Sequence, residues 1–209
     1  MLGPVASPET RAPPRVVGPN VRLGVIILAG GAASRMGQDK AALDWNGRSA
    51  VDRLAQVSAE LGAEAIVTVG PNDHGWPRVV ETPVGGGPVA GIVVGAAHLA
   101  KIGTDRLLVL AVDAPTLLAE DLVPLLGVSS PGAAYADLNL PLVMDLEPLP
   151  AQAGAGWSVH RLIEAVGLVR LPVPAQARDR LRGANTPDER AALLQALIAV
   201  ESAQKGGTP

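Results

Sequence analysis

The stretch of sequence that decides the fold runs from Gly24 to Lys40 and reads GVIILAGGAASRMGQDK. Its first five residues form a continuous apolar run with three β-branched residues, Val25 to Ile27, which is typical of a strand buried on both faces of a parallel sheet. Glycines and other small residues follow at once, and then Arg35, Asp39 and Lys40. Glycine lets backbone N–H groups approach an anion closely, and the two cations can neutralise phosphate. The pattern predicts either an anion-binding loop or a turn with solvated charges.

Lys40 distinguishes this stretch from the Walker A loop. A Walker A lysine follows glycine and precedes serine or threonine, whereas Lys40 lies between aspartate and alanine. We therefore set that interpretation aside. Lysine is scarce in the chain, which contains only Lys40, Lys101 and Lys205. The presence of one of the three in this stretch favours a specific role for its charge.

The composition of the chain excludes several classes of function. With 209 residues the chain is long enough for about one domain, and its net charge of −3 provides no strong basic field for nucleic acid. The absence of cysteine excludes disulfides, thiolate metal sites and a cysteine nucleophile. No apolar run approaches the roughly 18 residues that span a bilayer, and the N-terminal sequence is unlike a signal peptide. We expect a cytoplasmic protein with no nucleic-acid or membrane partner.

Apolar runs of strand length alternate with segments of helical length along the chain. This order predicts an α/β protein in which helices cover both faces of a mostly parallel sheet. Residues 129–156, rich in proline, glycine and alanine, receive no assignment. We expect strands at 24–28, 65–69, around 78 and at 106–112, and helices at 49–61, 88–100, 118–126, 158–166 and 186–202.

The domain organisation follows from the same pattern. Residues 1–20 contain many prolines and are expected to be a disordered lead, residues 21–202 a single domain, and residues 203–209 a disordered tail. In open α/β sheets ligands bind beyond the carboxyl ends of the strands. We therefore expect three loops, at 29–40, 81–91 and 113–116, to converge on one site.

Two of these loops carry candidate binding residues. Residues 84–92 read VGGGPVAGI, where the backbone around Gly87 could form a second wall against a flat ligand, or simply a tight turn into a helix. Residues 111–115 read AVDAP, and Asp113 at the end of the most apolar strand could bind Mg²⁺ together with substrate phosphates. The alternative for Asp113 is a residue that caps its own turn.

A fourth candidate lies near the C-terminus, where residues 183–189 read GANTPDE. Thr186 and the acids after it are explained by helix capping. Asn185 precedes the cap and could present its amide to a substrate or metal, or be an ordinary turn residue. The three histidines lie in different segments and match no metal-binding spacing.

These four stretches, in this order, resemble the MobA-like nucleotidyltransferase family that contains molybdenum cofactor guanylyltransferase. Residues 28–40 are similar to the signature L-A-G-G-x-S-x-R-M-G-x-D-K, with the serine one place late at Ser34. GGGPVAGI, AVDAP and NTPDE are similar to later motifs of the family, so the resemblance covers about residues 23–200. It implies a three-layer Rossmann-like α/β fold and transfer of GMP from GTP–Mg²⁺ to the phosphate of molybdopterin cofactor, with release of pyrophosphate.

The resemblance also implies roles for individual residues. Arg35 and Lys40 would hold the nucleotide phosphates, Asp113 would hold Mg²⁺, and Asn185 would face the acceptor. Transient contacts with proteins that deliver or accept the cofactor are implied too. The residues that would contact the nucleotide are Leu28, Ala29, Gly30, Gly31, Lys40, Glu81 and Gly87.

The chain departs from the family pattern at several positions. Glu81 lies near the place of an acidic base-binding residue that is usually Asp, Gly183 replaces the first Asn of N-x-N-T-P, and Leu140 precedes Pro141 where the family often has His. The nucleotide half therefore matches better than the acceptor half. Two alternatives stay open: a relative that uses CTP or another acceptor, and a nucleotide- or cofactor-binding protein without catalysis. Gly30 would leave room for a purine, which favours guanine.

Overall fold

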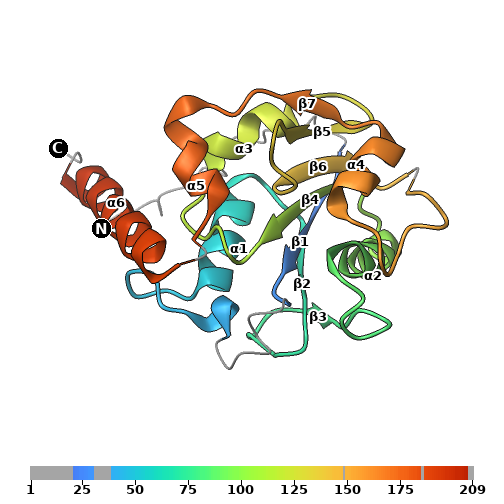
Figure 1. Cartoon of the computed structure of the whole chain (residues 1–209), viewed down its shortest axis with the longest axis horizontal. Coiled ribbons are helices and arrows are strands. Elements are labelled where there is room, and N and C mark those ends of the chain that lie inside the picture. The colour runs from blue at the N-terminus through green and yellow to red at the C-terminus, as the bar shows by residue number, and fades with distance from the viewer. Residues whose placement is uncertain (1–20, 31–38, 148, 185, 207–209) are drawn as a thin grey trace, which may run out of the picture.

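The protein is a three-layer α/β sandwich, seen in a computed structural model that describes residues 21–30, 39–147, 149–184 and 186–206 (Figure 1). None of the helices in this described part is long and apolar enough to cross a membrane. The strands are β1 (Leu23–Leu28), β2 (Ala65–Val69), β3 (Arg78–Val79), β4 (Arg106–Ala111), β5 (Gly132–Tyr135), β6 (Leu142–Asp145) and β7 (Val169–Leu171). The helices are α1 (Ala50–Glu60), α2 (Pro88–Lys101), α3 (Ala119–Leu126), α4 (Val159–Val166), α5 (Arg178–Arg182) and α6 (Pro187–Gly206), with short 3-10 helices η2 (Lys40–Ala42) and η3 (Ala175–Ala177).

The seven strands form one sheet in the order β3-β2-β1-β4-β6-β5-β7. The first four are mutually parallel, and β1 pairs with β4 in register from Leu23↔Arg106 to Leu28↔Ala111. Only β6 runs against its neighbours β4 and β5, while β7 is parallel to β5. The expected mostly parallel sheet is confirmed, and the carboxyl ends of β1 to β4 meet at one edge.

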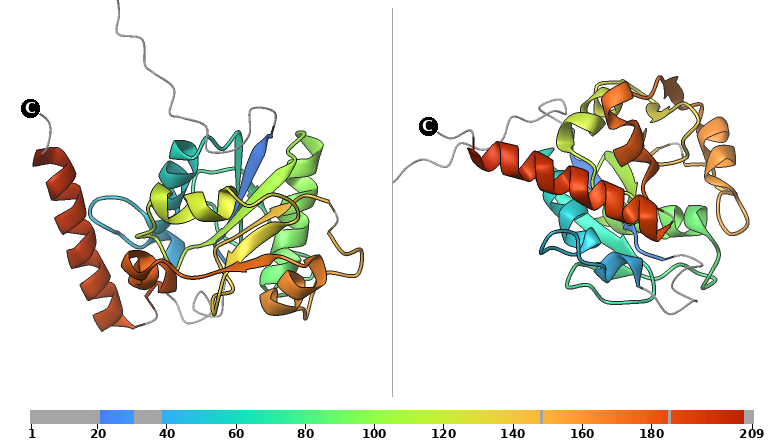
Figure 2. Two further views of the ribbon diagram at one scale, coloured as in Figure 1. Left: turned by 90° about the horizontal axis from the view of Figure 1, so that it is seen from above. Right: turned by 60° about the vertical axis from the view of Figure 1, so that its left-hand side comes forward.

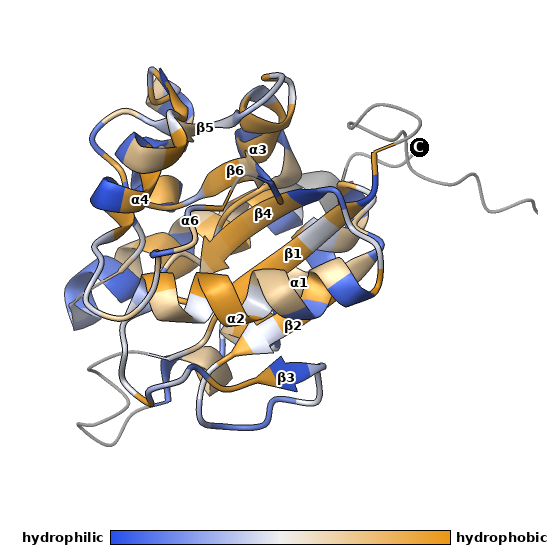
Figure 3. Ribbon diagram, turned by 90° about the vertical axis from the view of Figure 1, so that its right-hand side faces the viewer, coloured by the Kyte–Doolittle hydropathy of each residue, from blue (hydrophilic) through white to orange (hydrophobic). Residues whose placement is uncertain are grey.

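Alternate residues of the central strands face opposite helical layers, as the pleat of a strand requires. Val25 and Ile27 pack with α1, α3 and α6, while Ile26 and Leu28 pack with α2 and α4. The central strands β1 and β4 are mostly apolar and lie between these helices (Figures 2 and 3). Close layers explain the small residues of α2: a methyl group on Gly95 would lie 2.9 Å from the Ile26 Cδ1 atom. A core without Phe is possible because helix and sheet approach this closely.

The helices begin where the capping signals predict. Ser49 and Ser158 each accept a hydrogen bond from the backbone N–H three residues on, at 3.1 Å, and so start α1 and α4. Thr186 and Glu189 exchange hydrogen bonds in a capping box at the start of α6. This helix continues to Gly206, beyond the predicted end near Ser202, and runs along the side of the molecule (Figure 2).

The sequence did not predict β5, β6, β7 or α5. These elements have three to five residues each, and their residues (GAAY, LVMD, VRL and RDRLR) carry too little periodicity to separate strand, helix and turn. Their structure depends on neighbours in space. For example, β6 is fixed by antiparallel pairing with β4 along Arg106↔Asp145 to Val109↔Leu142.

A buried ion pair fixes α5 against α3. The carboxylate of Asp121 accepts hydrogen bonds from Arg180 Nε at 2.8 Å and Nη2 at 2.5 Å, and the Asp121 side chain is only 2% exposed. The same carboxylate accepts a hydrogen bond from the backbone N–H of Leu118. Arg180 comes from α5, so this pair holds the C-terminal segment beside the loop that follows β4.

Asp121→Ala should lower the free energy of unfolding by roughly 3–5 kcal/mol, because it leaves the half-buried Arg180 without its partner. Urea denaturation measures this change. The matched control is Glu120→Ala, since Glu120 lies 4.0 Å from the same arginine but is 74% exposed. The control should change stability by less than about 0.5 kcal/mol. Equal effects of the two substitutions would contradict the role assigned to Asp121.

Candidate functional site

The candidate site lies at the edge where the parallel strands end. Val112, after β4, donates a backbone hydrogen bond to Leu28 O at 3.3 Å, and Ala29, after β1, donates one to Val69 O at 2.8 Å. The loops that leave β1, β2 and β4 therefore start side by side. Leu28 and Ala29 are themselves buried, so they can offer a ligand mainly their backbone.

Gly30, Gly70 and Glu81 form one wall of the site. A methyl group on Gly30 would lie 3.6 Å from Gly70 Cα and 3.9 Å from Glu81 Oε1, which are ordinary contact distances. The protein itself therefore has no need of glycine at position 30. Gly70 differs, because a methyl group there would approach the backbone of Ala29 and Gly30 to 3.0 Å. The space in front of Gly30 remains available to a ligand.

The segment after β3 folds toward the same wall. Glu81 Oε1 accepts a hydrogen bond from the backbone N–H of Gly85 at 3.2 Å, which holds the turn before α2. Gly87 caps α2 with φ +91° and ψ 177°, a conformation that only glycine adopts readily. Because α2 follows a parallel strand, its N-terminus lies at the carboxyl edge of the sheet.

Asp39 organises the start of η2. Its carboxylate accepts hydrogen bonds from the backbone N–H of Ala41 at 3.1 Å and from Asn72 Nδ2 at 2.8 Å. His74 Nε2 lies 3.6 Å from the same carboxylate. Asp39 thus ties the loop after β2 to the segment that carries Lys40.

Lys40 and Asp113 meet at one peptide group of the segment between α5 and α6. The N–H of Ala184 donates to the backbone O of Asp113 at 2.9 Å, and Lys40 Nζ donates to the backbone O of Ala184 at 3.5 Å. The predicted phosphate-binding cation and the predicted metal ligand are therefore neighbours. Segments that are more than 140 residues apart in the sequence are joined here.

The Asp113 carboxyl is partly buried, and burial raises its pKa above the usual value. The Lys40 ammonium acts in the opposite direction and lowers the pKa, as does a backbone hydrogen bond within Asp113. Burial is the larger effect. A carboxylate at this position is therefore costly for the free protein and would be stabilised by an additional cation.

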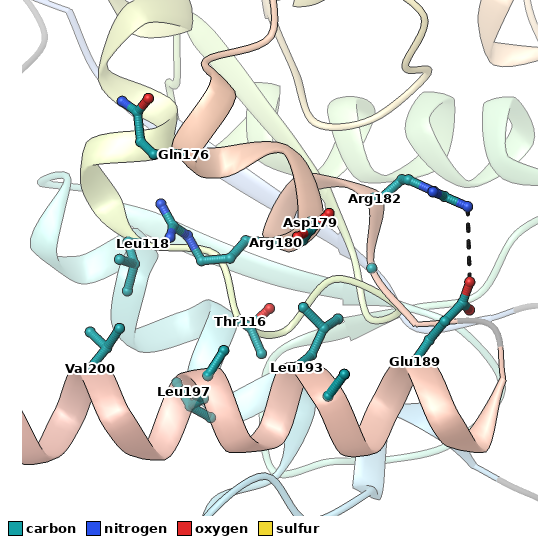
Figure 4. A pocket seen from close by; sticks show the side chains of 13 residues that line it. Thr116, Leu118, Gln176, Asp179, Arg180, Arg182, Glu189, Leu193, Leu197 and Val200 are labelled. Carbon is teal, nitrogen blue, oxygen red and sulfur yellow. Dashed lines mark ion pairs between the residues drawn. The ribbon is translucent and has the colours of Figure 1, made fainter.

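A hollow of about 270 Å³ opens beside Asp113. One side is formed by the segment 137–141, which includes Asn139 and Pro141, and the other by Leu181 and Arg182 of α5. The mixture of charged, amide and apolar groups suits a polar ligand with a flat apolar part. A second hollow, of about 300 Å³, lies between α5 and α6 and shares Arg182 with the first (Figure 4).

Some predicted site residues lie outside the described part of the chain, namely Gly31, Arg35 and Asn185. Of the others, Lys40 and Asp113 share the peptide of Ala184, while Gly30 and Glu81 form the opposite wall. The three loops at 29–40, 81–91 and 113–116 were expected to converge. Their described residues lie along one edge of the sheet, as topology requires.

Sequence reasoning missed Ala184, Asn139 and Arg182 as site residues. Ala184 acts through its backbone, which leaves no signal in a residue type. Asn139 and Arg182 belong to segments that received no assignment, and only the pairing of β5 and β6 and the buried pair of α5 bring them to the hollow. The one available hint was Leu140-Pro141, which stands where the family often has His before Pro.

The chain matches the model of a known protein family and is similar in sequence to individual proteins. A family model described as the MobA-like NTP transferase domain matches residues 25–138, more than half of the chain. Molybdenum cofactor guanylyltransferase of Xanthomonas euvesicatoria pv. vesicatoria is 32% identical over 178 residues, 81% of this chain and 93% of that protein. A probable molybdenum cofactor guanylyltransferase of Deinococcus radiodurans is 32% identical over 166 residues, 74% of this chain and 80% of that protein.

Solved structures with low sequence identity share the fold. A nucleotidyl transferase from Methanothermobacter thermautotroptrophicus is 16% identical with a TM-score of 0.65, covering 86% of this chain and 99% of that chain. Molybdopterin-guanine dinucleotide biosynthesis protein A from Archaeoglobus fulgidus is 19% identical with a TM-score of 0.58, covering 83% and 97%. The predicted three-layer Rossmann-like architecture is thereby confirmed.

Asp113→Asn should raise the melting temperature of the metal-free protein at pH 7 by a few degrees. For a domain of this size, a gain of 1 kcal/mol in stability corresponds to roughly 2–4 °C. The folded state holds the Asp113 proton to higher pH than the unfolded state does. Its contribution to stability is therefore lost as the pH rises above the ordinary value of 3.8, and a neutral amide avoids that loss. Thermal melts with a chelator, from pH 3 to pH 7, measure the effect.

The gain from Asp113→Asn should disappear below the ordinary carboxyl pKa, where both forms of the protein are neutral at this position. Asp188→Asn provides a control of opposite sign, because Asp188 lies in the first turn of α6, where the helix dipole favours negative charge. A lower melting temperature of Asp113→Asn at pH 7 would contradict the assigned cost of burial.

Proposed function

This chain belongs to the MobA-like NTP transferase family, and on that basis we propose that it transfers GMP from Mg²⁺–GTP to molybdenum cofactor and releases pyrophosphate. It is a nucleotidyltransferase by membership of the family. The choice of guanine and of the pterin acceptor draws on the relatives named molybdenum cofactor guanylyltransferase. The contacts of the site residues support this choice in the following ways.

The observation that carries the proposal is the junction of Lys40, Ala184 and Asp113. The Ala184 backbone is hydrogen-bonded to the Lys40 ammonium and to the backbone carbonyl of Asp113 at the carboxyl edge of a parallel sheet. A cation and a carboxylate-bearing residue placed in this way are suited to bind a nucleotide phosphate and its metal together. At about 4 Å a cation attracts a phosphate charge by roughly 4 kcal/mol at an effective dielectric near 20, before desolvation. We assign Lys40, with Arg35, to charge neutralisation on the phosphates.

Magnesium fits the donors that the site offers. Within the described ranges, no three His, Cys, Asp or Glu side chains cluster closely enough to hold a metal ion by themselves. Mg²⁺ usually takes one or two protein carboxylates and completes its shell with water and substrate phosphates. We propose Asp113 as the protein ligand. When bound, the ion would neutralise charge on the phosphates.

The wall formed by Gly30, Gly70 and Glu81 is the proposed site of the base. The protein's own packing leaves room for a side chain at position 30. We therefore explain the glycine there by a ligand that lies against its backbone. A carboxylate accepts hydrogen bonds only, and guanine presents two neighbouring donors, its N1–H and its exocyclic amino group. Glu81 can accept from them. The proposed nucleotide contacts also include the backbone of residues 28–31 and of Gly87.

The hollow between residues 137–141 and α5 is the proposed place of the acceptor. It adjoins Asp113 and has a positive side chain in Arg182, which suits the phosphate of molybdopterin. Asn185, the predicted acceptor-binding residue, follows Ala184 directly in the chain. Proteins that deliver or accept the cofactor would approach this open side.

The proposed reaction needs no general base. An oxygen of the acceptor phosphate is already an anion, and it forms a bond to the α-phosphorus of GTP while the bond to the pyrophosphate oxygen breaks. The protein then contributes by positioning the two substrates and stabilising the charge that develops. Lys40 and Arg35 would hold the phosphates in place and balance the charge that develops on the leaving pyrophosphate.

Lys40→Ala should reduce the rate of GMP transfer on the order of 10²–10³-fold, because it removes one preorganised positive charge. The measurement is pyrophosphate release with Mg²⁺, molybdenum cofactor and GTP, with CTP and ATP compared in parallel. Lys101→Ala, an exposed lysine in the last turn of α2, is the matched control and should keep the wild-type rate. Asp113→Ala should abolish most of the activity.

Three results of this assay would contradict the proposal. Preference for CTP would exclude the guanine assignment, and unchanged turnover of Lys40→Ala would make Lys40 an ordinary surface residue. A well-folded wild type that releases no pyrophosphate with any of the nucleotides would favour a binding protein without catalysis.

Glu81→Gln should reduce kcat/KM for GTP by about tenfold or more, since a hydrogen bond to a charged group contributes about 1.5–3 kcal/mol. Comparison with ITP, which lacks the exocyclic amino group, locates the effect. The wild type should prefer GTP to ITP, and the variant should lose most of that preference. The assignment of Glu81 to the base fails if the ratio of kcat/KM for GTP to that for ITP is the same in both proteins.

A further inference from the structure

Gly183 has a backbone conformation that side chains exclude. It ends α5 with φ +69° and ψ −173°, in a region of backbone conformations that is essentially restricted to glycine. The residue is buried between α5 and the loop after β4. Glycine is therefore dictated by the path of the chain at this point.

The surroundings of Gly183 give a second, independent reason for glycine. A methyl group here would collide with the carbonyl oxygen of Asp113 and lie 2.7 Å from its carbonyl carbon and 3.1 Å from Ala114 N. These are backbone atoms, which cannot rotate away as a side chain could. The backbone of Gly183 thus lies directly against the backbone of Asp113.

The next residue connects this contact to Lys40. The peptide N–H of Ala184 donates to Asp113 O, and its carbonyl accepts from Lys40 Nζ. A displacement of the segment would therefore move both groups. It would change the direction of the Asp113 side chain and deprive Lys40 of the hydrogen-bond acceptor that holds it near Asp113.

The segment is held from both sides. On one side the bidentate Arg180–Asp121 pair fixes α5, three residues before Gly183. On the other side the capping box of Thr186 and Glu189 starts α6, and Arg190 Nη2 donates to Asp44 O at 2.6 Å. Because α5 is held in place and Gly183 lies against the backbone of Asp113, the strain of a side chain at Gly183 would fall on Asp113.

We propose that Gly183 is a positioning residue, which sets the place of Asp113 and, through Ala184, of Lys40. The inference rests on the proposed function, in which Asp113 binds the metal–nucleotide. It also accounts for the departure from the N-x-N-T-P pattern: an asparagine at position 183 is incompatible with this backbone. Any contact that an asparagine side chain makes at this position in relatives must be made here by another group or be missing.

The test compares Gly183→Ala with Gly167→Ala. Gly167 ends α4 with φ +75° and is exposed, and a methyl group there meets no atom within 4 Å, so it tests a positive φ at a helix end without the contact. Binding of Mn²⁺ in the presence of GTP, without acceptor, is measured by electron paramagnetic resonance. Circular dichroism confirms that each variant is folded at the temperature of the assay.

Gly183→Ala should weaken Mn²⁺ binding about tenfold or more and reduce GMP transfer on the order of 10²-fold, as expected when a reacting geometry is displaced by about 1 Å. Gly167→Ala should lower the melting temperature and leave both quantities unchanged. In an Asp113→Ala background, Gly183→Ala should cause little further loss of Mn²⁺ affinity, because its effect passes through Asp113.

If Gly183→Ala does not fold, Ala184→Pro replaces it in the binding measurement. That substitution deletes the N–H that Asp113 O accepts and leaves Gly183 unchanged, and it should also weaken Mn²⁺ binding. Wild-type Mn²⁺ affinity in a folded Gly183→Ala protein, or in Ala184→Pro, would overturn the positioning role.

The same measurements separate this inference from the proposed function. If the wild type transfers no GMP but Gly183→Ala and Asp113→Ala both lose Mn²⁺ affinity, the positioning role stands and the proposed reaction is wrong. If the wild type transfers GMP and Gly183→Ala matches it in rate and affinity, the reaction stands and the positioning role is wrong.

Discussion

The parallel register between β1 and β4 is the constraint on which the site depends. Leu28 pairs with Ala111 at the end of both strands, so the chain leaves the sheet at the same level after each. This places the backbone around Gly30 and the carboxyl of Asp113 on one edge. A shift of the pairing would turn the apolar side chains of either strand to the wrong layer, and burial of both faces prevents it. The energetics of the core thus determine where the polar groups meet.

A second constraint comes from the C-terminal part of the chain. The segment from Gly183 to Ala184 passes over the end of β4 and contributes backbone groups where a side chain has no room. Burial makes an ionised Asp113 costly in the free protein, and Lys40 offsets only part of that cost. In the proposed function, a metal–nucleotide bound at Asp113 would relieve this cost of burial.

The two halves of the site differ in how strongly the sequence specifies them. The proposed nucleotide half draws on the motif at 28–40, whose residues are contiguous, and on Glu81 and Gly87 from a later loop. The proposed acceptor half is assembled from short elements, since Asn139 precedes β6 and Arg182 ends α5. Short elements carry little periodicity, which is why the sequence specifies that half less strongly.

The sequence by itself determined the central architecture, and it predicted the site residues that have a local signature. Continuous β-branched runs, serine and threonine caps, and the glycine-rich motif each contain their information within a few residues, so β1, β2, β4, α1, α2, α4 and α6 were predictable. Tertiary structure alone decided β5 to β7, α5, the hollow beside Asp113 and the placement of Gly183. These depend on pairing between distant segments, on the buried Arg180–Asp121 pair, and on a backbone contact with Asp113. Contacts between backbone atoms leave no pattern of side chains from which they could be predicted.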